Sequence, residues 1–283
     1  MRIALIANAA SGGGLDPEPL ADTMRRHGAE VRAYGCNPDD LGGVAAWAPE
    51  RLAVAGGDGT VGAAAELAGR LNVPLAVIAT GTANDFARAS ELPTEPDEAC
   101  VLAATGTELR PMELGRLADG RPFVNVASAG LASAAARRAQ PFKSFFGPLA
   151  YPLGALHAAI TEDPLRCTVC AGGEEVFDGE AWQAIVAVTG AFGGGSDIDA
   201  ADPEDGVLDT AILPAGSRLG LARRAWGLRR GSIAEQGDVC HARGTVVEVG
   251  LPPGTEFNVD GEVRDHGMER ITVEHHAYEL VVG

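Results

Sequence analysis

Short apolar segments alternate with helical patterns along the first hundred residues, and this alternation constrains the fold more than any other feature of the chain. Asp16 and Pro17 suit the N-cap and the first position of the first helical pattern. The segments with the length and composition of buried strands are 2–7, 30–34, 51–55 and 74–79. The helical patterns between and after them lie at 17–27, 38–47 and 61–71. Strands that alternate with helices predict a doubly wound parallel sheet.

The rhythm changes after about residue 115. Strand patterns separated by Gly, Pro and Asp turns follow at 122–128, 165–170, 181–191, 207–213, 245–249, 256–259 and 270–274. Helical patterns at 145–162 and 217–230 interrupt them. This composition is typical of a mostly antiparallel β-sandwich. We therefore predict an α/β domain at 1–115 and a β-sandwich domain at 116–283, with a cleft between the two.

Three glycine-rich loops follow predicted strands of the first domain, at the edge where ligands of such sheets bind. Glycine lets the backbone approach an anion, and the helix after each loop offers unpaired N–H groups. Thr60 and Thr82 add hydroxyl donors, whereas Asp58 and Asp85 would repel a phosphate and are expected to face Mg²⁺ or another cation. The residues that we assign to phosphate binding are Asn8, Ser11, Gly56, Gly57, Asp58, Gly59, Thr60, Gly81, Thr82, Asn84 and Asp85.

These loops have a simpler interpretation, in which the glycines only form tight turns between strand and helix. Three such loops at equivalent ends of one sheet favour phosphate binding over that alternative. The sequence contains no GxxxxGK[ST] loop, and no GxGxxG follows the first strand, so two common nucleotide-binding motifs are excluded.

Charge and apolar content limit the partners. Lys and Arg number 22 against 39 Asp and Glu, so the net charge is −17 and general nucleic-acid binding is not expected. No apolar segment has the 7–15 residues of a signal-peptide core with a cleavage site, or the roughly 20 residues of a spanning helix. We expect a soluble, cytoplasmic protein whose five cysteines are reduced. Cys167 and Cys170 lack a second pair for a zinc site.

The motifs AGGDGTVGAAAELA at 55–68 and GTANDFARA at 81–89 resemble the catalytic domain of diacylglycerol kinases, which is shared with sphingosine kinases and bacterial lipid kinases. The GGDG element alone is also found in NAD kinases and phosphofructokinases, whereas GTxNDFAR is far more specific. The motifs run through the chain in the order of the family: AGGDGTVGAAAELA at 55–68, GTANDFARA at 81–89, FVNVASAGL at 123–131, GGG at 193–195, DGVLDTAIL at 205–213 and NVDGE at 258–262. The resemblance implies a nucleotide-binding α/β domain and a β-sandwich domain for the lipid substrate, with the active site between them.

The resemblance also implies residue roles. Residues 56–61 and Thr82 would hold ATP. In the turn Asp260-Gly261-Glu262, Glu262 would be the general base that takes the proton of the lipid hydroxyl, with Asp260 beside it. Without the resemblance, Asp-Gly at this place is a strong signal for a hairpin turn. The carboxylate of Asp205 and the carbonyl groups of Asp202 and Val207 would form a structural Mg²⁺ site.

Lys143 is the only lysine of the chain and matches a lysine that the family places near its acidic loop. It would pair with Asp58 or Asp85 and organise the metal, unless it is simply a surface lysine. The first loop reads Asn8-Ala9-Ala10-Ser11, where the family has Asn-Pro and a nearby basic residue. Phosphate binding at this loop would therefore depend on backbone groups.

The sequence thus predicts an ATP- and Mg²⁺-dependent lipid kinase that meets its substrate at the inner face of a membrane. The segment 217–231 carries five arginines, no acid and one tryptophan, so it suits an interfacial helix on anionic lipid, although a helix packed on the sandwich would look alike. The apolar segment 144–160 contains two prolines and is expected to line an acyl cleft or pack internally. The alternatives are a kinase of a soluble substrate such as NAD and a nucleotide-binding module without catalysis.

Overall fold

The computed structural model describes residues 1–8, 16–131, 133–134, 161–191, 198, 201–218 and 239–283. The chain divides into two compact units: unit 1 is Met1–Leu114 with His276–Gly283, and unit 2 is Gly115–His275. The return of the C-terminal segment to unit 1 differs from the predicted second domain at 116–283. Its cause is a parallel pairing of Leu280 with Leu75, which adds the end of the last strand to the sheet of unit 1. The helical patterns at 145–162 and 217–230 fall almost entirely outside the described residues.

Unit 1 contains a parallel sheet in which β1 lies between β2 and β3. Its strands are β1 (Arg2–Ala7), β2 (Glu30–Tyr34), β3 (Arg51–Gly56) and β4 (Leu75–Ala79), in the order β2-β1-β3-β4. Every pairing among them is parallel. The chain adds β2 on one side of β1 and β3 on the other, so the order reverses between β1 and β3. Ligands of open α/β sheets bind at such a reversal, beyond the carboxyl ends of the strands.

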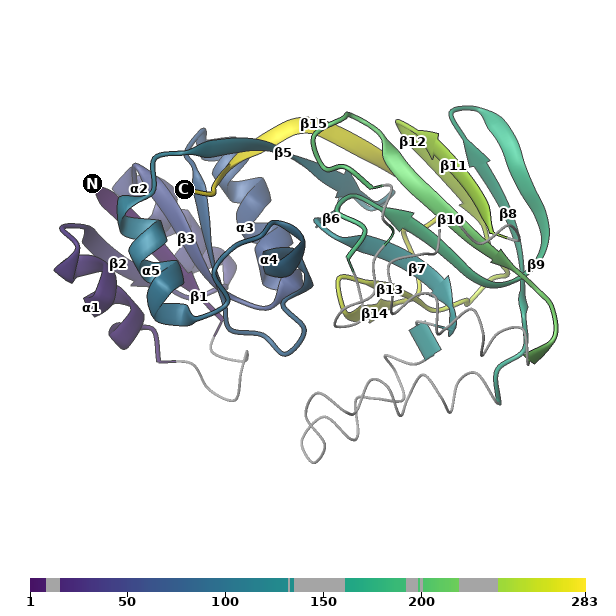
Figure 1. Ribbon diagram of the computed structural model, residues 1–283, viewed down its shortest axis with the longest axis horizontal. Coiled ribbons are helices and arrows are strands. Elements are labelled where there is room, and N and C mark those ends of the chain that lie inside the picture. Colours follow the sequence, from purple (N-terminus) through teal and green to yellow (C-terminus); the bar gives the residue numbers. More distant parts are fainter. Residues whose placement is uncertain (9–15, 132, 135–160, 192–197, 199–200, 219–238) are drawn as a thin grey trace. The chain divides into compact units, whose positions relative to one another are not determined.

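Helices cover both faces of this sheet, which confirms the predicted doubly wound architecture (Figure 1). The helices are α1 (Glu18–Arg26), α2 (Pro38–Trp47), α3 (Asp58–Leu71), α4 (Asp85–Ala89) and α5 (Pro96–Thr105). Helices α1 and α5 pack on the face that carries Ile3, Leu5 and Ile78. Helix α3 packs on β3 and β4 with its buried alanines, and alternation along the strands places it on the opposite face. Helix α5 was not predicted as a separate element.

Unit 2 is an antiparallel β-sandwich in which the long strand β9 (Glu174–Ala187) takes part in several pairings. The first half of β9 pairs with β8, and its second half pairs with β7 and β10. The other strands are β5 (Leu109–Arg116), β6 (Pro122–Phe123), β7 (Val126–Gly130), β8 (Leu165–Ala171), β10 (Leu208–Pro214), β11 (Cys240–Gly244), β12 (Val246–Gly250), β13 (Phe257–Val259), β14 (Glu262–Arg264) and β15 (Arg270–Val281). Strands β5 and β15 begin or end in unit 1.

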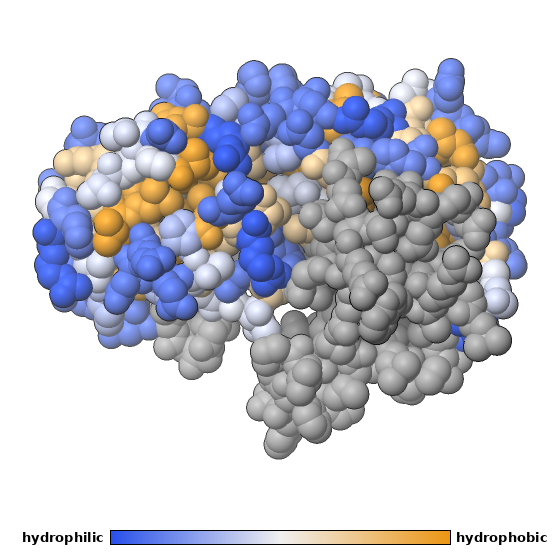
Figure 2. Space-filling model, viewed as in Figure 1, coloured by the Kyte–Doolittle hydropathy of each residue, from blue (hydrophilic) through white to orange (hydrophobic). Residues whose placement is uncertain are grey.

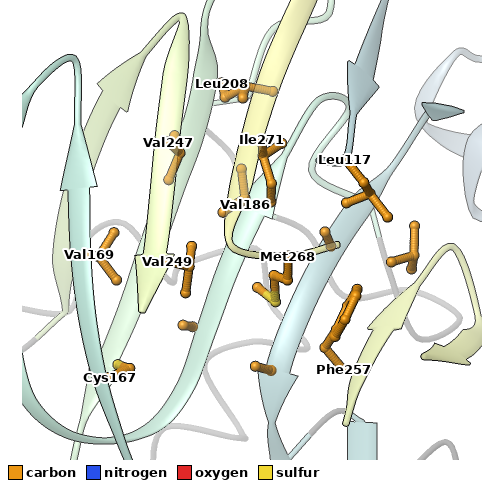
Figure 3. Close-up of a cluster of buried hydrophobic side chains, with 14 of the residues drawn as sticks. Leu117, Cys167, Val169, Val186, Leu208, Val247, Val249, Phe257, Met268 and Ile271 are labelled. Carbon is orange, nitrogen blue, oxygen red and sulfur yellow. The ribbon is translucent and has the colours of Figure 1, made fainter. Parts of the chain in front are cut away.

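The core of unit 2 is formed by side chains from most of its strands (Figure 3). Val169, Val186 and Val247 are fully or almost fully buried there, and Phe257 and Met268 close the end near β13. Alternation of buried and exposed residues along β8 and β12 places one face of each strand in this core. Strand pairing in the sandwich thus positions β10 and the β13–β14 hairpin. The acidic residues predicted from the sequence lie in the loop before β10 and in this hairpin.

The described surface is mixed in hydropathy. Hydrophilic residues cover most of the described surface seen in Figure 2, with smaller apolar areas between them. No helix in the described part of the chain is long and apolar enough to cross a membrane. None of the five cysteines forms a disulfide, and the CxxC pair lies on β8 with Cys167 buried and Cys170 half-buried.

Candidate active site

The loops after β1, β3 and β4 are joined by hydrogen bonds at the carboxyl edge of the unit 1 sheet. The Asn8 amide group donates from Nδ2 to Oγ1 of Thr60 at 3.0 Å, and the backbone N–H of Asn8 donates to Ala55. The backbone N–H of Thr80 donates to the carbonyl of Gly56 at 3.1 Å. The structure therefore brings Asn8, Gly56 and Thr60 together as predicted, although Asn8 serves as a link between loops in these contacts. Ser11 lies outside the described residues.

Glycine is required where the β3 and β4 loops meet. A Cβ atom added to Gly81 would lie 2.7 Å from the Cα of Gly57, which is closer than real Cβ contacts allow. A Cβ atom on Gly56 would lie 2.8 Å from the Cβ of Thr60. The two loops thus touch backbone to backbone and present few side chains. Such a surface suits the close approach of an anion, and helix α3 begins directly after Gly57.

Asp58 holds the start of helix α4. Its Oδ1 accepts a hydrogen bond from the backbone N–H of Phe86 at 2.9 Å, and its Oδ2 accepts one from that of Asp85 at 3.3 Å. The first N–H groups of a helix lack partners within the helix, and a carboxylate stabilises this end. We expected Asp58 to face a cation. These contacts give it a positioning role, in which it ties the GGDG loop to the GTANDF loop. That Asp58 also faces a cation stays a prediction.

Asp85 is almost fully buried and forms an ion pair with Arg88 one turn later in α4. The loop before it contains Asn84, whose φ of +53° lies in the left-handed region that asparagine tolerates better than most residues. The Oδ1 atom of Asn84 and the Oγ1 atom of Thr80 are buried without a hydrogen-bond partner among the described residues. Thr82 and Gly59 are exposed at this edge. Lys143, the predicted partner of these acids, lies outside the described residues.

In unit 2, the turn at Asp260 is a two-residue hairpin between β13 and β14. Asp260 has a φ of +46° and Gly261 a φ of +88°, as a type I′ turn requires. The carboxylate of Asp260 accepts hydrogen bonds from the backbone N–H groups of Val124, Asn125 and Val126 at 2.8–3.1 Å. The hairpin interpretation of Asp-Gly is therefore right, and Asp260 fixes the turn to the segment before β7.

Glu262 follows this turn, and its side chain is 54% exposed. Its Oε2 lies 3.0 Å from Nη1 of Arg121 and 3.9 Å from Nη2 of Arg264. Neither arginine was predicted from the sequence. Arg264 is two residues away on the same strand and could have been found from the period of a β-strand, whereas Arg121 lies in the β5–β6 turn and has no local signal. The arrangement presents a solvent-accessible carboxylate that a proton donor can reach.

The loop before β10 contains the residues predicted to hold Mg²⁺. Oδ1 of Asp205 accepts a hydrogen bond from the N–H of Val207 at 3.1 Å, and the N–H of Asp205 lies 3.5 Å from the carbonyl oxygen of Asp202. The structure thus brings Asp202, Asp205 and Val207 together in one turn. Oδ2 of Asp205 contacts the guanidinium group of Arg243 on β11. Arg243 was also missed.

Arg243 belongs to a charged cluster on one face of the β10–β11 pair. Asp209 is directly opposite Arg243 in the register and is only 1% exposed. Its Oδ1 lies 3.2 Å from Nε of Arg243 and 2.9 Å from Nε2 of His241. Burial raises the pKa of Asp209 above its usual value, and the nearby Arg243 and His241 oppose this shift.

The Asp202–Val207 turn fits a divalent cation in the chemistry of its donors. A carboxylate and two backbone carbonyl groups are oxygen ligands, which Mg²⁺ prefers. One carboxylate oxygen of Asp205 is, however, already in contact with Arg243. In the described part of the chain, no cluster of three or more His, Cys, Asp or Glu side chains could hold a metal ion. A cation at this turn would therefore rely on Asp205 and on backbone carbonyl groups.

Comparisons with known proteins match both units. Residues 2–117 match the family model described as the diacylglycerol kinase catalytic domain. Residues 125–282 match the model described as the YegS C-terminal NAD kinase beta sandwich-like domain. A Pseudomonas aeruginosa protein named "Probable lipid kinase YegS-like" is 32% identical over 78% of this chain and 73% of its own. A Bacillus subtilis protein named diacylglycerol kinase is 28% identical over 92% of this chain and 89% of its own.

Solved structures share the fold. A crystal structure of a diacylglycerol kinase from Bacillus anthracis has a TM-score of 0.78, with 20% identity over 100% of this chain and 97% of that chain. An NAD kinase from Archaeoglobus fulgidus in complex with ATP has a TM-score of 0.52, with 14% identity over 100% of this chain and 93% of that chain.

Proposed function

Because the chain belongs to the diacylglycerol kinase family, we propose that it transfers the γ-phosphate of ATP to the hydroxyl group of a lipid such as diacylglycerol. The observation that carries this proposal is the backbone-lined surface where the β3 and β4 loops meet. Gly57 and Gly81 approach each other so closely there that a side chain on Gly81 would clash with the backbone of Gly57. This surface lies at the carboxyl edge of an open α/β sheet, beside the reversal of strand order between β1 and β3, at the start of a long helix.

We assign the nucleotide phosphates to residues 56–60 and to the loop Gly81–Asp85. The N–H groups at the start of α3 and the hydroxyl groups of Thr60 and Thr82 would donate to phosphate oxygens. Asp58 joins the two loops, because its carboxylate accepts hydrogen bonds from the backbone N–H groups at the start of α4. Positioning and electrostatic stabilisation provide most of the catalysis in phosphoryl transfer, so a rigid loop edge matters more than a reactive side chain.

Glu262 is our candidate for the general base. A primary alcohol must lose its proton as it attacks the γ-phosphate, and a carboxylate can accept that proton. The contact with Arg121 leaves one carboxylate oxygen of Glu262 for this role. Asp260 is a positioning residue, because its carboxylate is bound to backbone N–H groups.

Magnesium enters in two places. Mg²⁺ bound to ATP would neutralise charge on the phosphates. At the Asp202–Val207 turn, Asp205 and the carbonyl groups of Asp202 and Val207 would hold a structural ion. That ion would stabilise the loop that leads into β10. It would take no part in the proton transfer, which we assign to Glu262.

The lipid is met at a membrane surface in this proposal. The segment 217–231 supplies Arg223, Arg224, Arg229 and Arg230 for anionic lipid. Arg218 differs from these four, since its guanidinium group lies 5.4 Å from the ring centre of Trp182 and 3.3 Å from Asp163. Replacement of these four arginines by Gln should weaken sedimentation with phosphatidylglycerol vesicles, while Arg218→Gln should have less effect. Equal effects of both changes would contradict this docking role.

Transfer of labelled phosphate from Mg-ATP tests the function directly. The acceptors are diacylglycerol, monoacylglycerol, phosphatidylglycerol, a polyprenol and a sphingoid base in mixed micelles, with NAD and sugar phosphates as soluble acceptors. We expect label in one lipid class and none in NAD. Label in NAD alone would establish the soluble-substrate alternative. Confirmed ATP binding without transfer to any acceptor would favour a module without catalysis.

A further inference from the structure

A buried pair of polar side chains lies beside the segment that binds the carboxylate of Asp260. The Oγ1 hydroxyl of Thr189 donates a hydrogen bond to Oδ1 of Asn125 at 2.6 Å. Asn125 is 2% exposed and Thr189 is 6% exposed, so both side chains lie in the interior of unit 2. Polar groups in the interior need partners, and a hydrogen bond in such surroundings has a defined direction. The pair therefore fixes Asn125 relative to the residues that follow β9.

Asn125 connects these residues with the turn at Asp260. Its backbone carbonyl accepts a hydrogen bond from the N–H of Val188 at 2.8 Å, and its own N–H donates to Oδ1 of Asp260 at 3.0 Å. The N–H of Asp260 donates in return to the carbonyl of Val126 at 3.1 Å. Strand β7, which begins at Val126, pairs with β9 on one side and with β13 on the other (Figure 1). Residues 124–126 thus lie between the hairpin and the end of β9.

Glu262 directly follows the turn of this hairpin. Its ion pair with Arg121 joins two side chains that are both about half exposed, and such a pair contributes little. The hydrogen bonds that the carboxylate of Asp260 accepts from residues 124–126 are partly buried and involve a charged acceptor, which makes each of them stronger. The backbone at Glu262 is therefore held mainly through Asp260.

We infer that Asn125 and Thr189 are positioning residues, which hold the turn that carries Glu262. The hydroxyl group of Thr189 holds the side chain of Asn125, and the backbone around Asn125 holds the carboxylate of Asp260. We call these contacts the Thr189–Asn125–Asp260 network. The inference rests on the proposed function for the task of Glu262, the proton transfer, whereas the network itself belongs to unit 2 alone. Both residues act through the turn and not on the substrate.

The test removes the hydroxyl group of Thr189 from the full chain. Thr189→Val keeps the size and branching of the side chain but offers no donor to Oδ1 of Asn125. We expect amide hydrogen exchange of residues 124–126 and 260–262 to become about tenfold faster, the effect of one hydrogen bond between buried groups. Exchange of strand β8 should stay unchanged, because β8 pairs with the first half of β9, far along the strand from this contact. A general loss of stability of unit 2 would accelerate exchange in β8 as well.

Phosphate transfer gives the second readout. With saturating lipid, kcat of Thr189→Val should fall about tenfold, because a misplaced base loses part of its rate advantage. KM for ATP should stay unchanged, since the residues that we assign to the nucleotide phosphates belong to the loops of unit 1. Thr189→Ser keeps the hydroxyl group and should restore both exchange and kcat.

Thr210→Val is the matched control. Thr210 is a fully buried threonine of the neighbouring strand β10, and its Oγ1 atom has no hydrogen-bond partner among the described residues. Loss of this hydroxyl group should change neither the exchange of residues 260–262 nor the turnover. Thr189→Ala also lacks the hydroxyl group and takes the place of Thr189→Val if the latter does not fold.

Unchanged exchange at residues 124–126 and 260–262 in Thr189→Val would overturn the inference. Equal effects of Thr189→Val and Thr210→Val, or no restoration by Thr189→Ser, would overturn it as well. Faster exchange with an unchanged kcat would show that the network does not serve the reaction, and the positioning role would be wrong. Absence of transfer by the natural chain contradicts the proposed function instead. Faster exchange in Thr189→Val would then still support the hold of the network on the turn.

Discussion

In unit 1, the β3 and β4 loops meet through glycine backbone, whereas in unit 2 the turn at Asp260 and the loop at Asp205 are held by charged side chains. Gly81 approaches Gly57 too closely for a side chain, and Asp58 joins the same loops through helix N–H groups. In unit 2, Asp260 binds three backbone N–H groups, and Glu262 and Asp205 each contact an arginine from another part of the sheet.

This difference follows from what each region has to do in the proposed reaction. A phosphate chain carries several negative charges, and backbone N–H groups and helix ends bind it without bulk. A proton acceptor must be a side chain, and its orientation requires neighbours that fix it. Substitutions in unit 1 are therefore limited by the space for side chains, and substitutions in unit 2 by the charges that hold its acidic residues.

Glu262→Gln should give the largest effect on turnover. If Glu262 accepts the proton of the lipid hydroxyl, kcat for phosphate transfer falls at least about 100-fold, because the amide cannot act as a base. Glu274→Gln is the matched control, since Glu274 is also about half exposed and also pairs with an arginine of unit 2. Unchanged turnover in a folded Glu262→Gln variant would remove Glu262 from the mechanism.

Gly81→Ala should give the largest effect on stability, and Gly57→Ala is its matched control. The new methyl group would lie 2.7 Å from Cα of Gly57 in the first variant, but 3.6 Å from Cα of Gly81 in the second. Overpacking of this kind costs about 1–3 kcal/mol of unfolding free energy, which urea unfolding would measure. ATP affinity should fall with it, because the loops must separate. A Gly81→Ala variant as stable as Gly57→Ala would refute the backbone contact.

Asp260→Asn and Asp58→Asn compare the two units through the same change. In Asp260→Asn, an amide nitrogen replaces a carboxylate oxygen that accepts a hydrogen bond from the backbone, so a buried N–H group loses its acceptor. The free energy of unfolding should fall by about 1–3 kcal/mol. In Asp58→Asn, the retained oxygen can keep the 2.9 Å contact with Phe86, and the 3.3 Å contact with Asp85 is lost. The cost should then be about 0.3–1 kcal/mol, the size of a charge at a helix start. Chemical denaturation of both variants measures this order, and a reversed order would show that charge matters more in unit 1.

The sequence predicts most of the fold and the local part of the site. Alternating patterns predict the parallel sheet, and glycine spacing places Gly56, Gly57 and Gly81 at its carboxyl edge, because these signals lie within a few residues of each other. Arg121 and Arg243 were missed because they reach Glu262 and Asp205 from distant parts of the chain. Only strand register brings such pairs together, and register depends on the whole sandwich.

One buried thiol in each unit makes the stability of the protein depend on pH. Burial raises the pKa of Cys100 on α5 to about 12 and that of Cys167 on β8 to about 11, from 9.0. Below pH 9 both thiols are neutral in the folded and unfolded states, so their contribution to stability is intact. As the pH rises above 9, the unfolded thiols ionise first and stability is lost.

Each thiol should lower the unfolding free energy by about 1.4 kcal/mol between pH 8 and pH 10, because one pKa unit corresponds to about that energy. Urea unfolding at both pH values measures the loss, and Cys100→Ala or Cys167→Ala should each remove about half of the part due to these two thiols. The two units should respond equally in this range, since both folded thiols remain neutral up to pH 10. A loss that only one variant reduces would mean that the other thiol ionises in the folded protein, so that burial in helix and in strand would not be equivalent.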